Sequence, residues 1–242
     1  MLSLLAVCTA AVLVVIVVMI RDISRQPTTA SPAALAVSSS ASATPSAKAS
    51  PRANTSPSPA VIRIRDAVTD ASSGLSYGLL GSPWRRGCPL QLNTPMFSWS
   101  AGENAVAGHA TIDGTATEWY GNACSGLLGQ QFAYSGTADL EPTAMGLVGA
   151  LDPAYYSGLQ HYRTLEGSSA LTISGHQAWV VRFLMTYPDA ASQGLAWSSE
   201  AGAVVVADRG AGQSPAIFYV SVPSNLGTSD VSTLISSLRL AS

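Results

Sequence analysis

Ser169–Phe183, SALTISGHQAWVVRF, is the stretch of sequence that decides the fold. Apolar and β-branched residues dominate its two halves, which extend over Leu171–Ser174 and Ala178–Tyr187. Between them, Ser174-Gly175-His176 is typical of a hairpin turn, since glycine adopts backbone conformations that other residues avoid. The stretch therefore predicts two neighbouring antiparallel strands.

The same pattern continues toward the C-terminus. Ala203–Ala207 and Ala216–Val222 are rich in Val, Ile, Phe and Tyr and are separated by Gly, Pro and Asp, which predicts two more strands. Asp230 is a good N-cap for a final helix. The apolar residues of that helix recur at helical spacing and predict a buried stripe of Val231, Leu234, Ile235 and Leu238.

Upstream, further strands and two helices are predicted. The strands are Val61–Ala67, Phe97–Ser100, Ala105–Ile112 and Glu118–Leu128. The first helix follows Asp139, with a stripe of Met145, Leu147, Val148 and Leu151, and the second covers Ala154–Arg163, with Tyr155, Leu159 and Tyr162 on one face. Strands in series with inserted helices indicate an α+β fold, an antiparallel sheet with helices packed on it.

The order of these segments resembles that of PsbP-like α/β/α domains. The residues that carry the resemblance are the hairpin quoted above, AVVVADRG (203–210), PAIFYVSVP (215–223), DVSTLISSLRL (230–240) and the early GLSY (74–77) with PW (83–84). The family includes the photosystem II extrinsic subunit and actinobacterial exported lipoproteins of the LpqN type. The resemblance implies a PsbP-like sandwich with a non-enzymatic binding or accessory function, and it transfers no active-site residue. The lipoprotein members carry a lipidated Cys where this chain has an apolar segment.

That apolar segment is Leu2–Ile20, which contains no charged residue and no proline. A helix of roughly 20 such residues crosses a bilayer core of about 30 Å, so residues 1–20 are predicted to form a transmembrane signal-anchor helix. Val7 is too large for the position before a lipidated cysteine, and Cys8 is therefore interpreted as a membrane-buried thiol.

Residues 21–60 are predicted to form a disordered linker. Pro27–Ala60 consists almost entirely of Ser, Ala, Pro and Thr without apolar periodicity, and such a segment cannot bury enough surface to offset the entropy of ordering. The globular domain then covers residues 61–242. The basic residues of the linker either keep it solvated or place it near anionic lipids or wall polymers.

The side of the membrane is judged from two opposing signals. Arg21 and Arg25 follow the apolar helix, and the positive-inside rule favours the cytoplasm for them. The Ser/Ala/Pro/Thr linker and two cysteines in the domain favour the outside. We expect a single-pass protein of the cell membrane whose C-terminal domain is extracytoplasmic.

Charge restricts the partners. Only 11% of the residues are charged, and the domain carries eight arginines against thirteen acidic residues, a net charge of −5. An acidic domain without a basic stripe argues against nucleic acid as a partner. The single lysine, Lys48, beside eleven arginines and abundant alanine is typical of a GC-rich, actinobacterial genome.

Cys88 and Cys124 are the cysteines of the domain. In an extracytoplasmic domain such a pair favours a disulfide, which would stabilise the fold by about 3–4 kcal/mol for a loop of this length. Two buried free thiols, or a redox or metal site, are the alternatives. The sequence has no C-x-x-C motif, so a zinc site is poorly supported.

No catalytic, cofactor or metal motif stands out. The histidines, His109, His161 and His176, are scattered over a predicted strand, helix and turn, and S-x-x-K and H-E-x-x-H are absent. G-x-S-x-G occurs once, at residues 74–78, but no helix is predicted to follow it, so it is not interpreted as a nucleophile elbow. Five residues are candidate ligand contacts, because Trp and Arg together suit the recognition of sugars or anions. They are Trp84, Arg85, Arg86, Trp197 and Glu200, with burial of both tryptophans in the core as the alternative.

Together these observations predict a membrane-anchored extracytoplasmic α+β domain with a non-enzymatic binding or accessory role at the cell envelope, where its partner would be a protein, a wall polymer or a lipid. An exported hydrolase without a recognisable motif and a structural subunit of an envelope complex are the alternatives. No cofactor is predicted.

Overall fold

The computed structural model describes residues 66–90 and 95–241. The predicted anchor helix, the predicted linker and residues 61–65 of the first predicted strand lie outside the described residues. Within the two described ranges, no helix is both long enough and apolar enough to cross a membrane.

The described chain forms two antiparallel sheets and two α-helices. The large sheet has the order β3-β4-β5-β9-β8-β7-β6. Its strands are β3 (Arg85–Arg86), β4 (Phe97–Ile112), β5 (Thr115–Leu128), β6 (Tyr162–Ile173), β7 (His176–Thr186), β8 (Ser199–Ala207) and β9 (Ala216–Pro223). The small sheet has the order β1-β2-β10, with β1 (Ala67–Thr69), β2 (Leu75–Gly78) and β10 (Arg239–Leu240). The helices are α2 (Leu140–Leu151) and α3 (Asp230–Ser237).

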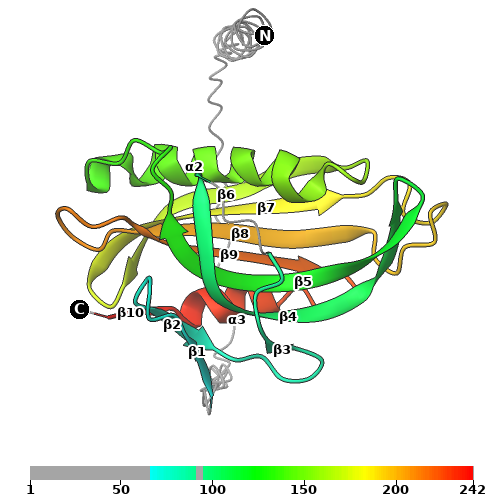
Figure 1. Cartoon of the computed structure of the whole chain (residues 1–242), viewed down its shortest axis with the longest axis horizontal. Helices are drawn as coiled ribbons and strands as arrows, with labels where there is room; N and C mark the ends of the chain where they lie inside the picture. The colour runs from blue at the N-terminus through cyan, green and yellow to red at the C-terminus, as the bar shows by residue number, and fades with distance from the viewer. Residues whose placement is uncertain (1–65, 91–94, 242) are drawn as a thin grey trace, which may run out of the picture. The chain divides into compact units, whose positions relative to one another are not determined.

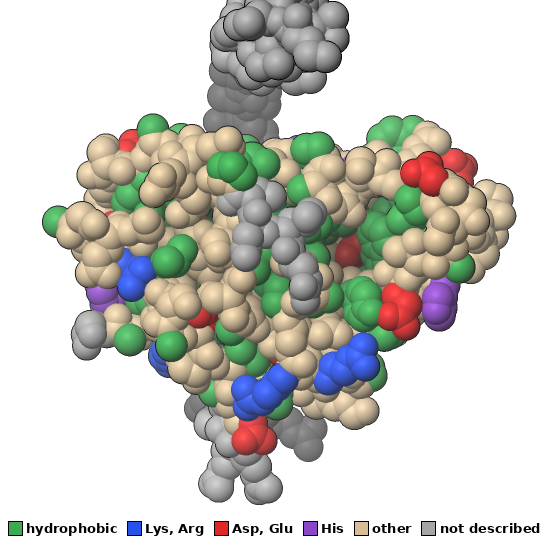
Figure 2. All heavy atoms as spheres, in the orientation of Figure 1, with side chains coloured by type: hydrophobic (Ala, Val, Ile, Leu, Met, Phe, Trp, Pro, Cys, Tyr) green, Lys and Arg blue, Asp and Glu red, His purple; other side chains and the backbone are tan. Residues whose placement is uncertain are grey.

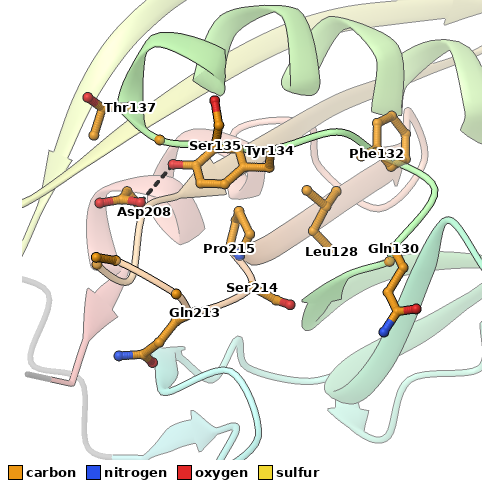
Figure 3. Close-up of a pocket in the computed structure, with 15 residues that line it drawn as sticks. Leu128, Gln130, Phe132, Tyr134, Ser135, Thr137, Asp208, Gln213, Ser214 and Pro215 are labelled. Carbon is orange, nitrogen blue, oxygen red and sulfur yellow. Dashed lines mark hydrogen bonds between the residues drawn. The ribbon is translucent and has the colours of Figure 1, made fainter.

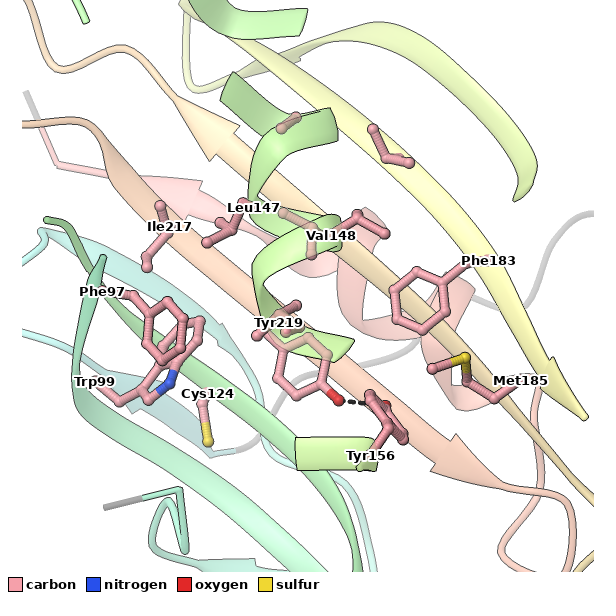
Figure 4. Packing of buried hydrophobic residues seen from close by; sticks show 14 of the residues in the cluster. Phe97, Trp99, Cys124, Leu147, Val148, Tyr156, Phe183, Met185, Ile217 and Tyr219 are labelled. Atoms are coloured by element: carbon pink, nitrogen blue, oxygen red, sulfur yellow. Dashed lines mark hydrogen bonds between the residues drawn. The ribbon is translucent and has the colours of Figure 1, made fainter. Parts of the chain in front are cut away.

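The large sheet is the middle layer of the domain. Figure 1 shows α2 on one side of it and α3 with the small sheet on the other. Every residue of β9 is buried, because successive side chains of a strand point to opposite faces and both faces of this strand are covered. Ile217 and Tyr219 belong to the core under α2, whereas Phe218 and Val220 belong to the core under α3. Figure 4 shows Leu147 and Val148 of α2 above the first of these cores.

The structure confirms the predicted C-terminal strands, their hairpin and the final helix, but the N-cap of that helix is Ser229, and Asp230 is its first residue. Ser174 and Gly175 form the turn with positive φ angles of 51° and 88°, and β6 and β7 pair directly on either side of it. Val231, Leu234 and Ile235 are buried on α3, and Leu238 is buried directly after it. Alternating apolar residues therefore predicted the C-terminal third correctly.

The predicted helix over Ala154–Arg163 is wrong. A single π-helical turn, Asp152–Tyr156, continues α2, and β6 begins at Tyr162. Tyr162 is 60% exposed, so it does not belong to a buried helical stripe. Pairing of β6 with β7 along its whole length outweighs the helical spacing, which is an instance of tertiary structure overriding local pattern.

Two smaller predictions are corrected. The predicted strands Phe97–Ser100 and Ala105–Ile112 form one strand, β4, with bulges after Trp99 and Val106. Asp139 precedes α2 as predicted, but its side chain makes no cap hydrogen bond. Its carboxylate instead accepts hydrogen bonds from the backbone N–H and the hydroxyl of Ser135, at 2.7 and 2.6 Å.

Candidate functional site

A buried carboxylate lies near the start of β8. Glu200 is 1% exposed and belongs to the α2 side of the large sheet. Its Oε2 atom accepts hydrogen bonds from the indole N–H of Trp119 at 3.2 Å and from the hydroxyl of Tyr187 at 2.6 Å. Its Oε1 atom accepts a hydrogen bond from the hydroxyl of Ser221. Burial raises the pKa of Glu200 because a low-dielectric surrounding disfavours the charged form.

A chain of hydroxyl groups extends from Glu200 toward α2. The hydroxyl of Tyr156, on the π-helical turn, lies 3.0 Å from that of Ser221 and is hydrogen-bonded to that of Tyr219. Figure 4 shows the tyrosine pair meeting beneath α2. Burial raises the pKa of both tyrosines, so these hydroxyls stay neutral.

Aromatic rings enclose this polar group. Trp119 and Trp197 are stacked, with ring centroids 5.7 Å apart and an interplanar angle of 18°. Tyr187 meets both rings edge-on, at 6.1 and 6.5 Å. Such arrangements add about 0.5–1.5 kcal/mol to the burial of each pair and fix the orientation of the rings.

A cavity of about 310 Å³ opens beside this cluster. Glu200 is part of its wall. Five aromatic residues also line it: Trp119, Tyr120, Tyr155, Tyr156 and Tyr219. The volume lies at the lower end of the roughly 300–1,000 Å³ that ligand pockets occupy. Among the described residues that line the cavity, none is Lys, Arg or His, whereas Glu118 adds a second carboxylate.

The predicted disulfide is present and supports one wall of the cavity. Cys88 and Cys124 are bonded, with their Cα atoms 5.5 Å apart. The bond ties the segment with Pro89 and Leu90, which line the cavity, to the middle of β5. Gly102 lies underneath: a Cβ atom there would come within 2.7 Å of the Cβ of Cys88. Glycine at this position therefore makes room for the disulfide.

His161 lies near the cavity but does not line it. Its Nε2 atom lies 2.9 Å from Oδ1 of Asp152, and its Nδ1 atom lies 2.8 Å from the carbonyl oxygen of Leu159. Arg163 contacts the other oxygen of Asp152 at 2.8 Å. Both ring nitrogens are thus engaged with acceptors, which leaves neither to take a proton from a nucleophile. His161 also lies directly before β6 and not on the predicted helix.

The predicted ligand contacts are divided between two places. Trp197 and Glu200 lie together in the cluster above, both buried, and Glu200 lines the cavity. Trp84 is buried in the core under α3, while Arg85 and Arg86 are exposed on β3. The structure therefore does not assemble all five residues into one site.

Four residues of the cluster were not predicted as site residues: Trp119, Tyr156, Tyr187 and Ser221. Trp119 comes from β5, Tyr156 from the π-helical turn, Tyr187 from the segment that follows β7, and Ser221 from β9. These residues meet only because of the strand order of the large sheet. The one local signal is the aromatic pair Trp119-Tyr120 beside Glu118.

A second pocket, of about 420 Å³, lies between the segment after β5 and the β8–β9 connection. Figure 3 shows a hydrogen bond between two of its side chains, from the Tyr134 hydroxyl to Asp208, with a length of 2.7 Å. Glycines and loop residues form much of its wall. Because it contains no buried charged side chain, it is the weaker candidate.

Metal binding finds no support in the described part of the chain, where no group of three His, Cys, Asp or Glu side chains is arranged to hold an ion. On the face in Figure 2, charged side chains lie in small groups and do not form one extended patch. The Glu200 cavity is therefore the candidate functional site.

Comparison with known proteins gives a likeness of fold. No protein-family model matches the sequence, and no curated protein matches it either. The structure is similar to the solution structure of cyanobacterial PsbP (CyanoP) from Synechocystis sp. PCC 6803, with a TM-score of 0.45 and 10% sequence identity over 72% of this chain and 93% of that chain. The name of that protein, PsbP, is also the name of the family that the sequence resembles. A likeness of this degree assigns no role to any residue of this chain.

Proposed function

We propose that this chain is a membrane-anchored extracytoplasmic binding domain, and that it holds a small ligand, or a protruding group of an envelope molecule, in the cavity beside Glu200. The observation that carries this proposal is the combination of a buried carboxylate with an aromatic-walled cavity. Convergent polar groups in an otherwise apolar pocket are the usual signature of a binding site.

The disulfide supports the extracytoplasmic part of the proposal. Disulfides form and persist in oxidising compartments and are rare in the cytosol. Cys88–Cys124 therefore agrees with a domain outside the membrane, joined through the Ser/Ala/Pro/Thr-rich linker to the apolar segment Leu2–Ile20.

Thiol labelling of whole cells tests the location. A membrane-impermeant maleimide is applied before and after reduction to cells that carry a C8S variant, so that Cys88 and Cys124 are the cysteines that can react. Labelling only after reduction is the expected result. Labelling that requires lysis but no reduction would place the domain in the cytoplasm and contradict the proposal.

Filling the cavity tests the binding function. Ala154 lines the cavity from the π-helical turn, so A154L would occupy the space of a ligand. The matched control is A191L, at an exposed alanine outside the residues that line this cavity. A set of small cationic, neutral and anionic compounds is titrated against the tryptophan fluorescence of the full chain in a maltoside detergent. Binding by wild type and A191L but not by A154L is expected, and an absence of binding by every compound would overturn the proposal.

A further inference from the structure

Building on the proposed function, we propose that the group held beside Glu200 is an alkylated ammonium, with a quaternary ammonium as the best fit. Three features of the cavity carry this inference: the carboxylates that line it, the nature of its walls and the small number of free hydrogen-bond acceptors, of which the buried Oδ1 of Asn122 is one.

The acidic side chains that line the cavity are two carboxyl groups. Glu200 lies in the buried wall and Glu118 is exposed on β5. The basic groups near the cavity do not line it: His161 and Arg163 are paired with Asp152, and Arg85 interacts with the hydroxyl of Tyr120. An anionic ligand would face both carboxylates in a poorly hydrated space, whereas a cation would be attracted by them.

The walls are rich in aromatic rings, which attract cations. Trp119, Tyr155 and Tyr219 come from three different elements and enclose the same space, with Tyr155 and Tyr219 stacked at 6.2 Å. A ring attracts a cation through its quadrupole when the charge lies within about 6 Å of the centroid, and tryptophan and tyrosine do so most strongly. A neutral apolar ligand would fill the same space without using this attraction.

The hydrogen-bonding state of the walls selects the kind of ammonium. An ionised carboxylate has about four acceptor positions, and Glu200 already receives three hydrogen bonds. The hydroxyls of Tyr156, Tyr219 and Ser221 bond to one another, and that of Tyr155 accepts a bond from the indole N–H of Trp99 at 2.8 Å. A primary ammonium needs three acceptors and would find few, whereas a quaternary ammonium needs none.

The size of the cavity limits the bound part to a small head group. About 310 Å³ accommodates a methylated ammonium with a short chain but not a whole lipid. The same chemistry has two sources in an envelope, a free methylated amine and the head group of a choline-type lipid. The experiment below therefore uses soluble probes of both kinds.

The test is a titration of the full chain, in maltoside detergent, with four matched probes. Choline is the quaternary cation, ethanolamine the primary one, 3,3-dimethyl-1-butanol the neutral isostere of choline, and 3,3-dimethylbutanoate its anionic counterpart. We expect choline to bind at least about tenfold more tightly than the neutral isostere, and more tightly than ethanolamine.

Variants connect the selectivity to the carboxylate. E200Q should reduce the preference for choline over the neutral isostere about tenfold, and E118Q should reduce it less, since Glu118 is exposed. E103Q is the matched control, because Glu103 is equally buried but lies near the backbone of Leu80 and outside the residues that line the cavity. Circular dichroism verifies that each variant is folded. If E200Q does not fold, E118Q still tests whether a carboxylate of the cavity contributes to the selectivity.

The outcomes separate this inference from the function on which it rests. If the neutral or anionic probe binds as tightly as choline and A154L abolishes that binding, the cavity is a binding site but the ammonium assignment is wrong. Tighter binding of ethanolamine than of choline would overturn the preference for a quaternary group. If no probe binds, both proposals fail. Where choline binds, tighter binding of glycerophosphocholine assigns the lipid head group as the source, and weaker binding assigns the free amine.

Discussion

The indole N–H of Trp119 and the carboxylate of Glu200 lie 3.2 Å apart although 81 positions separate them in the chain. Their strands, β5 and β8, are not neighbours in the large sheet, because β9 lies between them. Ser221, on β9, binds the other carboxylate oxygen. The carboxylate thus joins three adjacent strands, and its environment exists only when the central part of the sheet is complete.

Removing one donor to this carboxylate should destabilise the domain. In Y187F, Glu200 loses a hydrogen bond of 2.6 Å while its oxygen stays buried, so the free energy of unfolding should fall by about 1–3 kcal/mol. The control is Y162F, which removes the hydroxyl of a tyrosine that is 60% exposed and should change stability by less than about 0.5 kcal/mol. Urea unfolding measures both variants, and equal effects would contradict the role of the cluster.

Choline affinity should rise with pH. Burial raises the pKa of Glu200, and a bound cation favours its ionised form, so binding should release a proton where the free carboxyl is still protonated. The titratable groups that face Glu200 are Tyr156, Tyr187 and Tyr219, all held neutral by burial, and His161 with its partner Asp152.

Calorimetry in two buffers with different heats of ionisation counts the protons released, and E200Q serves as the control in which the release should disappear. An affinity that does not change with pH, together with no proton release, would show that Glu200 does not respond to the ligand.

Stability should fall as the pH rises through the range in which Glu103 ionises. Burial raises the pKa of Glu103 from its ordinary value of 4.5 to about 7, so the folded state holds a proton that the unfolded state releases. The stabilisation is complete below pH 4.5 and is lost as the pH rises toward 7. A loss of about 2 kcal/mol is expected between pH 4.5 and pH 8.

The E103Q variant isolates this contribution. It should unfold with a flatter pH dependence than the wild type, whereas E141Q, at an exposed glutamate on α2, should reproduce the wild-type curve. Equilibrium unfolding at intervals of one pH unit provides the comparison. Identical slopes for E103Q and the wild type would assign the pH dependence to another group.

Loss of the disulfide should destabilise the domain by about 4 kcal/mol, since it closes a loop with a sequence separation of 36. The double variant C88S/C124S removes the bond, and treatment of the wild type with a reductant gives an independent measurement. Thermal unfolding should show the same shift for both. Because Pro89 and Leu90 line the cavity next to the bond, choline binding should weaken as well.

Gly202 should not tolerate even a methyl group. A Cβ atom there would lie 2.3 Å from the ring of Phe183 on the paired strand, and that ring is fully enclosed in the core. G202A should therefore lower the free energy of unfolding by about 1–3 kcal/mol. G167A is the matched control, because Gly167 is on an exposed strand with no atom within 4 Å of such a Cβ. If both variants unfold alike, the packing argument is wrong.

Much of the fold follows from local sequence pattern. Residues such as Val204, Val206 and Phe218 alternate with residues that face the opposite core. Glycine, proline and aspartate mark the turns, so the positions of the strands can be predicted from the sequence alone. The helical spacing of Tyr155, Leu159 and Tyr162 was misleading, because pairing with β7 is a long-range interaction that no local window contains.

The site followed much less from the sequence. Glu200 was singled out beside Trp197 as a candidate ligand contact, whereas the structure buries both residues. Trp119, Tyr187 and Ser221 could not be grouped with it, because the grouping depends on strand order and register. Burial of a carboxylate among tyrosines is a property of the assembled sheet and has no motif.

The small sheet joins the two ends of the domain, since β2 pairs with both β1 and β10. The hydroxyl of Tyr77, on β2, contacts the large sheet at the carbonyl oxygen of Ala123. A mechanical pull on the chain before β1 would therefore be borne first by the β1–β2 pair and by the C-terminal residues next to it. The Glu200 cavity lies on the other side of the large sheet, so a force applied through the proposed membrane anchor would leave the shape of the cavity unloaded.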